Sequence, residues 1–292
     1  MIEAIFEYQF LRNAVISGIV IGFLAPILGV FLVVRRLSMI ADALSHITLS
    51  GIAFHLLLGK FFAFFGPLNP IYMGMLFSVG GGLAIDKLRK TYKHYQELAI
   101  PIMLSTGIAF GVVFISIAGG FNTDLFTYLF GSIVAIRQSD MITIFAIGVI
   151  VLIVILLLYK ELFSLSFDAE NAKTTGIPGR MINLIFILMV ALIIASAMRI
   201  VGILLVSALM VLPVASSLRL ANSFKQTFLY AIIFGQTSVL TGLYLAFELD
   251  WAPGGTIVII SFIILLTIMT IQKTKDFFTS HNQRRDVVRS KQ

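Results

Sequence analysis

The sequence contains no cysteine, and few of its residues carry a charge. Without cysteine, the 292 residues can form neither disulfides nor thiolate metal sites. Only 12% of the residues are charged, whereas soluble domains have roughly 25%. Hydrophobic residues make up 59% of the chain, and the mean hydropathy is +1.03. This composition indicates an all-α integral membrane protein, a bundle of transmembrane helices that crosses the bilayer several times.

Several catalytic motifs are also absent. The sequence has no G-x-x-x-x-G-K-[ST] phosphate loop, no H-E-x-x-H metalloprotease motif and no G-x-S-x-G elbow. We therefore expect no ATP hydrolysis by this chain and no other enzymatic activity. The net charge of +7 is read as an excess of basic residues in cytoplasmic loops, so no nucleic-acid partner is expected.

Long apolar runs fill most of the chain. A membrane-spanning helix needs about 20 mostly apolar residues, and nine segments qualify: 10–34, 39–59, 67–86, 98–118, 139–159, 181–199, 201–218, 226–247 and 255–272. A tenth segment, 122–136, is short and is interpreted as a re-entrant or interfacial helix. Because polar residues interrupt 39–59 and Pro213 interrupts 201–218, eight spans is the alternative count.

The distribution of basic residues supports nine spans. If the chain starts outside and alternates, 17 of the 21 Lys and Arg residues fall in inner segments. This asymmetry follows the positive-inside rule and predicts an outer N-terminus and a cytoplasmic C-terminus. We expect residues 1–273 to form the transmembrane domain. Residues 274–292 would form a flexible basic tail near anionic lipid.

Glycine pairs at a spacing of four predict close helix packing in two of the spans. The pairs are Gly18 with Gly22 and Gly107 with Gly111. Small residues at this spacing let membrane helices approach closely. Glycine is also generally more frequent in membrane helices than in soluble ones, so the pattern alone leaves both explanations open.

Two polar side chains stand out in the second span. Asp42 is the only acidic residue placed well inside a span, and His46 follows it by four positions. An Asp at a helix centre costs about 2.5–3.5 kcal/mol, and such residues mark transport pathways. Residues four apart share one helix face. Counted from Arg36, His46 lies about 15 Å into the membrane, near its middle.

The chemistry of this pair leaves several roles open. A carboxylate oxygen and an imidazole nitrogen suit Zn²⁺, Mn²⁺ or Fe²⁺, but the spacing also fits a helix-stabilising pair, a proton relay or a buried structural hydrogen bond. Two ligands are fewer than the four or so that zinc takes, and a two-fold dimer would double them. His55 lies nine positions after His46, about half a turn off this face, and its role is left open.

The inner loop at 160–180 contains the run SFDAENAKTTGIPGR. This pattern predicts a short helix that starts at Ser166 or Asp168 and ends at Gly176. A short helix on the cytoplasmic face suits docking to a partner protein. A solvated connector is the alternative.

Five stretches, in order along residues 10–272, resemble the membrane permease of ABC importers for zinc, manganese and iron. They are RRLSMIADALSHITLSGIAF, TDLFTYLFGSI, SFDAENAKTTGI, MRIVGILLVSALMVLPVASSLRLA and WAPGGTIVI. The resemblance implies a type II importer fold in a bacterial cytoplasmic membrane. It also implies a permease homodimer, two copies of a separate cytoplasmic ATPase and an extracytoplasmic metal-binding protein.

The resemblance also implies roles for particular residues. Asp42 and His46 match a D-x-x-x-H motif that coordinates the transported metal, with zinc expected first and manganese next, and with no permanently bound cofactor. The matches to the loop that docks into the ATPase are Asp168, Ala169, Glu170, Ala172 and Gly176. Members of the family often carry a proline just before this acidic pair, where this chain has Phe167 and Asp168. Arg35 and Arg36 match a basic pair that anchors the topology.

A second class of function remains an alternative at this point. In a proton-coupled secondary transporter or channel, Asp42 and His46 would relay protons. The ATP-driven importer predicts uptake that depends on a separate ATPase. The alternative predicts uptake by this chain alone, driven by the proton gradient.

Overall fold

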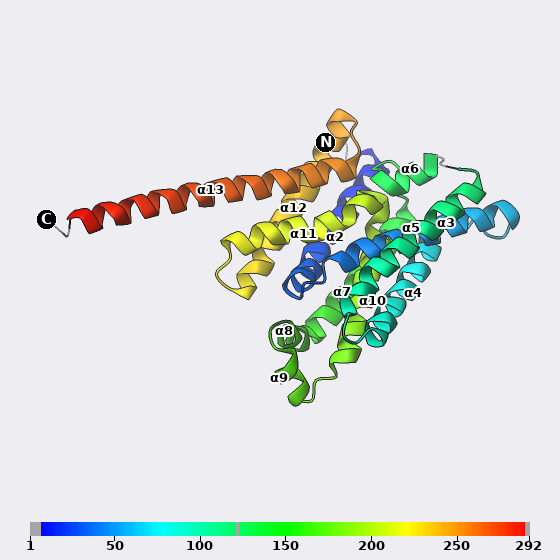
Figure 1. Ribbon diagram of the computed structural model, residues 1–292. Coiled ribbons are helices and arrows are strands. Elements are labelled where there is room, and N and C mark those ends of the chain that lie inside the picture. Colours follow the sequence, from blue (N-terminus) through cyan, green and yellow to red (C-terminus); the bar gives the residue numbers. More distant parts are fainter. Residues whose placement is uncertain (1–6, 121–122, 290–292) are drawn as a thin grey trace.

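The computed structural model describes residues 7–120 and 123–289, and all regular structure in these ranges is helical (Figure 1). The long helices are α2 (Gln9–Val34), α3 (Met39–Phe61), α4 (Pro70–Thr91), α5 (Ala99–Ala118), α7 (Gln138–Leu157), α10 (Gly179–Val201), α11 (Ile203–Leu220), α12 (Phe224–Leu249) and α13 (Pro253–Arg289). The short helices are η1 (Gln96–Leu98), α6 (Thr123–Phe130), α8 (Tyr159–Phe167) and α9 (Ala169–Thr174).

The expected number of spans is confirmed. Within the described ranges, 9 helices are long and apolar enough to cross a membrane, rather than the eight of the alternative count. Pro213 lies inside α11, which continues through it. Of the short segment predicted at 122–136, residue 122 lies outside the described residues, α6 covers Thr123–Phe130, and the backbone from 131 to 136 is not helical.

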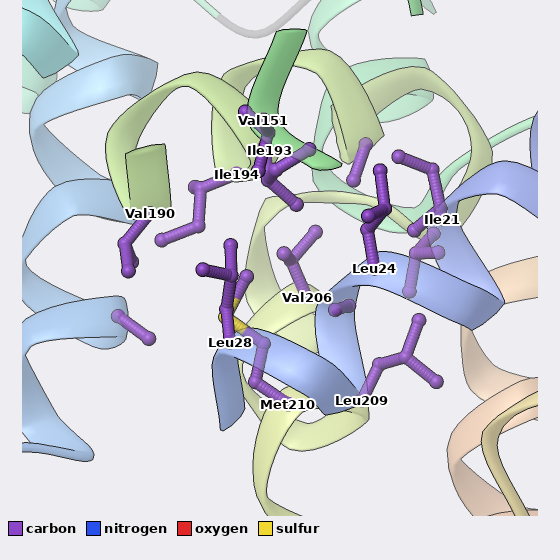
Figure 2. Packing of buried hydrophobic residues seen from close by; sticks show 14 of the residues in the cluster. Ile21, Leu24, Leu28, Val151, Val190, Ile193, Ile194, Val206, Leu209 and Met210 are labelled. Atoms are coloured by element: carbon purple, nitrogen blue, oxygen red, sulfur yellow. The ribbon is translucent and has the colours of Figure 1, made fainter. Parts of the chain in front are cut away.

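Helices α2 and α10 form the centre of the bundle. In their most apolar windows 72% and 78% of the residues are buried, compared with 28% in α5, α7 and α13. Figure 2 shows the apolar side chains of α2, α10 and α11 gathered in one cluster, among them Leu28, Ile194 and Val206. The outer helices expose apolar side chains, as expected where lipid tails replace water.

Close approach of the helices depends on glycine, as the glycine pairs predicted. A Cβ atom added to Gly18 would lie 2.7 Å from Leu243 Cδ1 of α12, and one added to Gly107 would lie 3.2 Å from the carbonyl carbon of His46 in α3. A closer contact is made at Gly29, where a Cβ would lie 1.9 Å from the carbonyl oxygen of Met210. The backbones of α2 and α11 are therefore in direct contact.

The bundle has two different ends. α6 lies at one end, and α8 and α9 lie at the opposite end, near the loop that joins α4 to α5 (Figure 1). We call the end with α8 and α9 the docking end. α13 extends beyond the bundle toward the C-terminus (Figure 1). The division at residue 273 and the flexibility of the tail stay predictions.

Candidate metal-binding site and docking helix

Asp42 and His46 lie in the first two turns of α3, on one face of the helix. α3 begins only at Met39, after a non-helical turn that runs from residue 35 to residue 38. The helical rise from Met39 to His46 is about 10 Å. The sequence-based depth of about 15 Å assumed a continuous helix from Arg36, whereas the helical rise applies only from Met39, and the depth of His46 in the membrane stays a prediction.

The two side chains are half-buried and are not bonded to each other. Among the described residues, neither has a hydrogen bond or an ion pair, although the Asp42 carboxylate is close enough to act electrostatically on His46. The structure thus does not contain the buried Asp42–His46 hydrogen bond that the spacing had left open. Both groups are available to a third, shared partner.

Helix α5 holds the backbone of α3 at this position. Ser50 Oγ donates a hydrogen bond to the carbonyl oxygen of Gly107. A Cβ atom on Gly107 would lie 3.0 Å from the backbone nitrogen of Ile47, so no larger residue fits there without displacing α3. The backbone of the segment that carries His46 is therefore held in place by α5.

One chain provides an incomplete ligand set. The described residues contain no group of three or more His, Cys, Asp or Glu side chains that could hold a metal ion. Asp42 and His46 would supply two of the four or so ligands that zinc takes. Any further His, Cys, Asp or Glu ligand would have to come from outside the described part of this chain.

His55 lies apart from this pair, as its helical position predicted. It is buried, with 4% of its surface exposed. Its ring packs edge-on against the Phe65 ring, with the ring centroids 6.1 Å apart. This arrangement fastens the loop after α3 to the helix, which is a structural role.

The predicted helix in the inner loop is present as α9, and a further short helix, α8, precedes it. Asp168 is the N-cap of α9, and its Oδ1 atom accepts a hydrogen bond from the backbone nitrogen of Asn171 at 2.8 Å. Ser166 instead donates to the carbonyl oxygen of Leu162 inside α8. Gly176 follows the end of α9 with a φ of 82°, in the left-handed region that glycine adopts without strain.

The residues of α9 and its N-cap differ in their exposure to solvent. Asp168 and Glu170 are exposed, whereas Ala172 is fully buried. Ala169 is the first residue of the helix. The buried alanine holds α9 against the bundle, and the exposed carboxylates can contact a partner protein.

Helix α10 connects the docking end to the site. α9 packs against α8 and α10, and α10 packs against α3. Arg35, directly before α3, donates a hydrogen bond to Asn183 Oδ1 of α10, and its guanidinium lies 5.4 Å from the centroid of the Phe186 ring. A displacement of α9 can therefore reach the beginning of α3 through α10.

A buried ion pair at the opposite end was not predicted from the sequence. Arg199 Nη1 lies 2.6 Å from Asp140 Oδ2, and Arg199 Nη2 donates to the hydroxyl of Tyr128 at 2.9 Å. Asp140 also accepts hydrogen bonds from Asn69 Nδ2 and from the backbone nitrogen of Arg137. Asp140 and Arg199 stand at the ends of two predicted spans, on the same side of the membrane. Their opposite charges were the one feature of the sequence that could have predicted this ion pair.

Comparison with known proteins gives consistent matches over nearly the whole chain. The model of the ABC 3 transport family matches residues 7–272. The manganese import system permease protein ScaB of Streptococcus parasanguinis is 33% identical over 285 residues, which cover 96% of this chain and 98% of that protein. The manganese transport system membrane protein MntC of Listeria monocytogenes is 32% identical over 263 residues, covering 90% and 91%. The solved structure of PsaBC from Streptococcus pneumoniae in complex with Fab superposes with a TM-score of 0.79 at 30% identity, covering 91% of this chain and 93% of that chain.

Proposed function

Because the chain belongs to the ABC 3 transport family, we propose that it is the membrane permease of an ATP-driven importer of divalent first-row metal ions. The observation that carries this proposal is the face of α3 that holds Asp42 and His46, two metal-ligating side chains that are not bonded to each other. The metal is the substrate of this protein, and the permease itself has no enzymatic activity.

Manganese is the favoured substrate. A carboxylate and an imidazole suit manganese and zinc alike, so the ligand types do not decide between them. The relatives ScaB and MntC are both named as manganese systems, and this favours manganese for this chain. The sequence-based preference for zinc stays a prediction without support from these relatives.

A homodimer completes the site in this proposal. Two-fold symmetry would bring two Asp42 and two His46 side chains to one axis, which gives the four ligands that one chain lacks. A ligating histidine must be neutral, so metal binding would compete with protonation of His46. An extracytoplasmic binding protein would deliver the metal ion to the end that carries α6.

Two copies of a separate ATPase would bind the docking end, with α9 as the docking helix. Closure of the ATPase pair would displace α9, and α10 would transmit this displacement to α3. Access to the Asp42–His46 site would then alternate between the two sides of a bacterial cytoplasmic membrane. The basic loops place the docking end and the C-terminus in the cytoplasm in this proposal.

The proposal is tested by uptake of labelled manganese and zinc in cells that lack this chain and are complemented with variants. We expect Asp42→Ala and His46→Ala to abolish uptake at normal membrane abundance. Glu97→Ala and His94→Ala are the matched controls, because both residues are exposed and lie outside the site. Normal uptake by either site variant would refute the site assignment. Uptake that persists with the ATPase disabled and follows the proton gradient would favour the secondary transporter.

A further inference from the structure

A pocket apart from the Asp42–His46 face lies between the end of α4, η1 and the start of α10. Its volume is about 590 Å³. Four basic side chains line it, and Asp86 is the only acidic residue among its lining residues; the basic ones are Arg89, Lys90, Lys93 and Arg180. Asp42 and His46 are not among the lining residues, so the metal-transport proposal does not account for this pocket.

The charges in this pocket are not balanced. Lys90 forms an ion pair with Asp86, which neutralises one of the four cations. Within the described residues, the side chains of Arg89, Lys93 and Arg180 have no ion-pair partner. The pocket therefore carries about three uncompensated positive charges, which repel a metal cation and attract an anion.

Arg35, in the turn between α2 and α3, adds a further positive charge next to this pocket. It is bonded to Asn183, which lines the pocket, while its buried Nη1 atom has no hydrogen-bond partner among the described residues. Burial, and secondly the positive charge of Arg89, lower the pKa of Arg35 to about 10. The two guanidinium groups are thus close enough to repel each other, and an anion between them would relieve this repulsion.

The start of α10 adds to the positive potential. α10 is a 23-residue helix with no acidic residue in its first turn, and Arg180 and Asn183 in its first turns both line the pocket. The free backbone N–H groups of a helix N-terminus carry partial positive charge. Cationic side chains, an amide side chain and a helix N-terminus therefore converge on one cavity.

We propose that this pocket binds a phosphate group, and specifically that of an anionic phospholipid. Arginine guanidinium groups bind phosphate oxygens in a bidentate manner. Basic pockets between transmembrane helices on the cytoplasmic side bind lipid headgroups. The pocket lies where α4 ends and α10 begins. Because both helices are candidate membrane spans, these ends would lie near the membrane surface, within reach of a lipid phosphate. A free phosphate shares this chemistry and is the other source.

The test measures binding by the 292-residue chain in nanodiscs of phosphatidylcholine with or without phosphatidylglycerol, using native mass spectrometry and thermal unfolding. In separate samples, inorganic phosphate or pyrophosphate is added to phosphatidylcholine nanodiscs. Arg89→Gln and Arg180→Gln should each weaken phosphatidylglycerol binding about fivefold. Lys87→Gln is the matched control, because Lys87 is an exposed cation of the same helix that does not line the pocket, and it should leave binding unchanged.

The outcomes separate the two sources. Stabilisation by phosphatidylglycerol but not by free phosphate identifies the lipid, and the reverse identifies a soluble phosphate at the same site. The Arg89→Lys variant keeps the positive charge but lacks the guanidinium group, and it should bind phosphatidylglycerol with intermediate affinity. The proposal can therefore be tested even if the Gln variants fail to fold. Equal binding of both anions by the wild type and by the Arg89→Gln/Arg180→Gln variant overturns the proposal. No readout involves metal transport.

Discussion

Arg199 Nη1 lies 2.6 Å from Asp140 Oδ2, and both side chains are buried. This ion pair joins the C-terminal part of α10 to the first turn of α7. Asn69, directly before α4, and Tyr128 of α6 are bonded to the same two residues. The pair therefore fixes four elements at the end of the bundle opposite the docking helix.

Removal of one partner from this pair should destabilise the protein strongly. Asp140→Ala leaves the Arg199 guanidinium buried without its counter-charge, and Arg199→Ala does the same to the carboxylate. Breaking a buried pair in this way costs about 3–5 kcal/mol. The free energy of unfolding, measured in detergent with denaturant, should fall by this amount in each variant.

The ion pair of Lys90 with Asp86 is the matched control. Lys90 is 52% exposed, and exposed pairs contribute about 0–1 kcal/mol. Lys90→Gln should therefore change the free energy of unfolding much less than Asp140→Ala. Similar losses in the two variants would show that the buried network does not hold this end together.

The backbone contact between α2 and α11 gives a second prediction. In Gly29→Ala, the new methyl group would lie 1.9 Å from the carbonyl oxygen of Met210, so the two helices must separate. Overpacking typically costs about 1–3 kcal/mol, and the loss here should reach the upper part of this range because a backbone atom is in the way. Thermal unfolding in detergent measures the effect.

Gly80→Ala serves as the comparison for this variant. Nothing lies within 4 Å of a Cβ atom at Gly80, and alanine is a better helix former than glycine by about 1 kcal/mol. Gly80→Ala should leave the unfolding temperature unchanged or raise it. An equal loss in both variants would mean that glycine acts through helix flexibility rather than through the contact with Met210.

The bundle was predictable from the sequence because each span carries its own signal of about 20 apolar residues, and the α9 cap was predictable because Asp168 acts on a residue three positions away. Features that depend on distant partners were not. Asp140 and Arg199 are separated by 59 positions, and nothing local shows that they meet. The start of α3 at Met39 agrees with the predicted span 39–59. The turn before it, at residues 35–38, contains no glycine or proline to mark it, so the depth of His46 was counted as if the helix ran from Arg36.

The cap of α9 provides a third prediction, which rests on the proposed docking role. Asp168→Ala removes the side-chain acceptor for the backbone nitrogen of Asn171 and should cost about 1 kcal/mol of local helix stability. The ATPase subunit should then bind the permease about fivefold more weakly in a titration of the purified subunits. Asp168→Asn keeps an N-cap acceptor and should bind nearly normally. If Asp168→Asn is as defective as Asp168→Ala, the charge of Asp168 matters rather than the cap.

A shared site makes a fourth prediction, about mixed dimers. If two chains jointly coordinate one metal ion, a dimer with one defective chain lacks half of the ligands and should not transport. Cells that produce wild-type and His46→Ala chains in equal amounts would then contain about one quarter fully wild-type dimers, by random pairing of a two-fold assembly. Metal uptake should therefore fall to about one quarter of the wild-type value rather than to one half.

The control for this experiment is an equal mixture of wild-type and His94→Ala chains, which should transport normally because His94 is exposed in the loop after α4. Western blots of the membrane fraction establish that both chains are present in equal amounts. Uptake at one half of the wild-type value would indicate that each chain transports by itself. In that case the missing ligands do not come from a second copy, and Asp42 with His46 would have to act through ligands such as water.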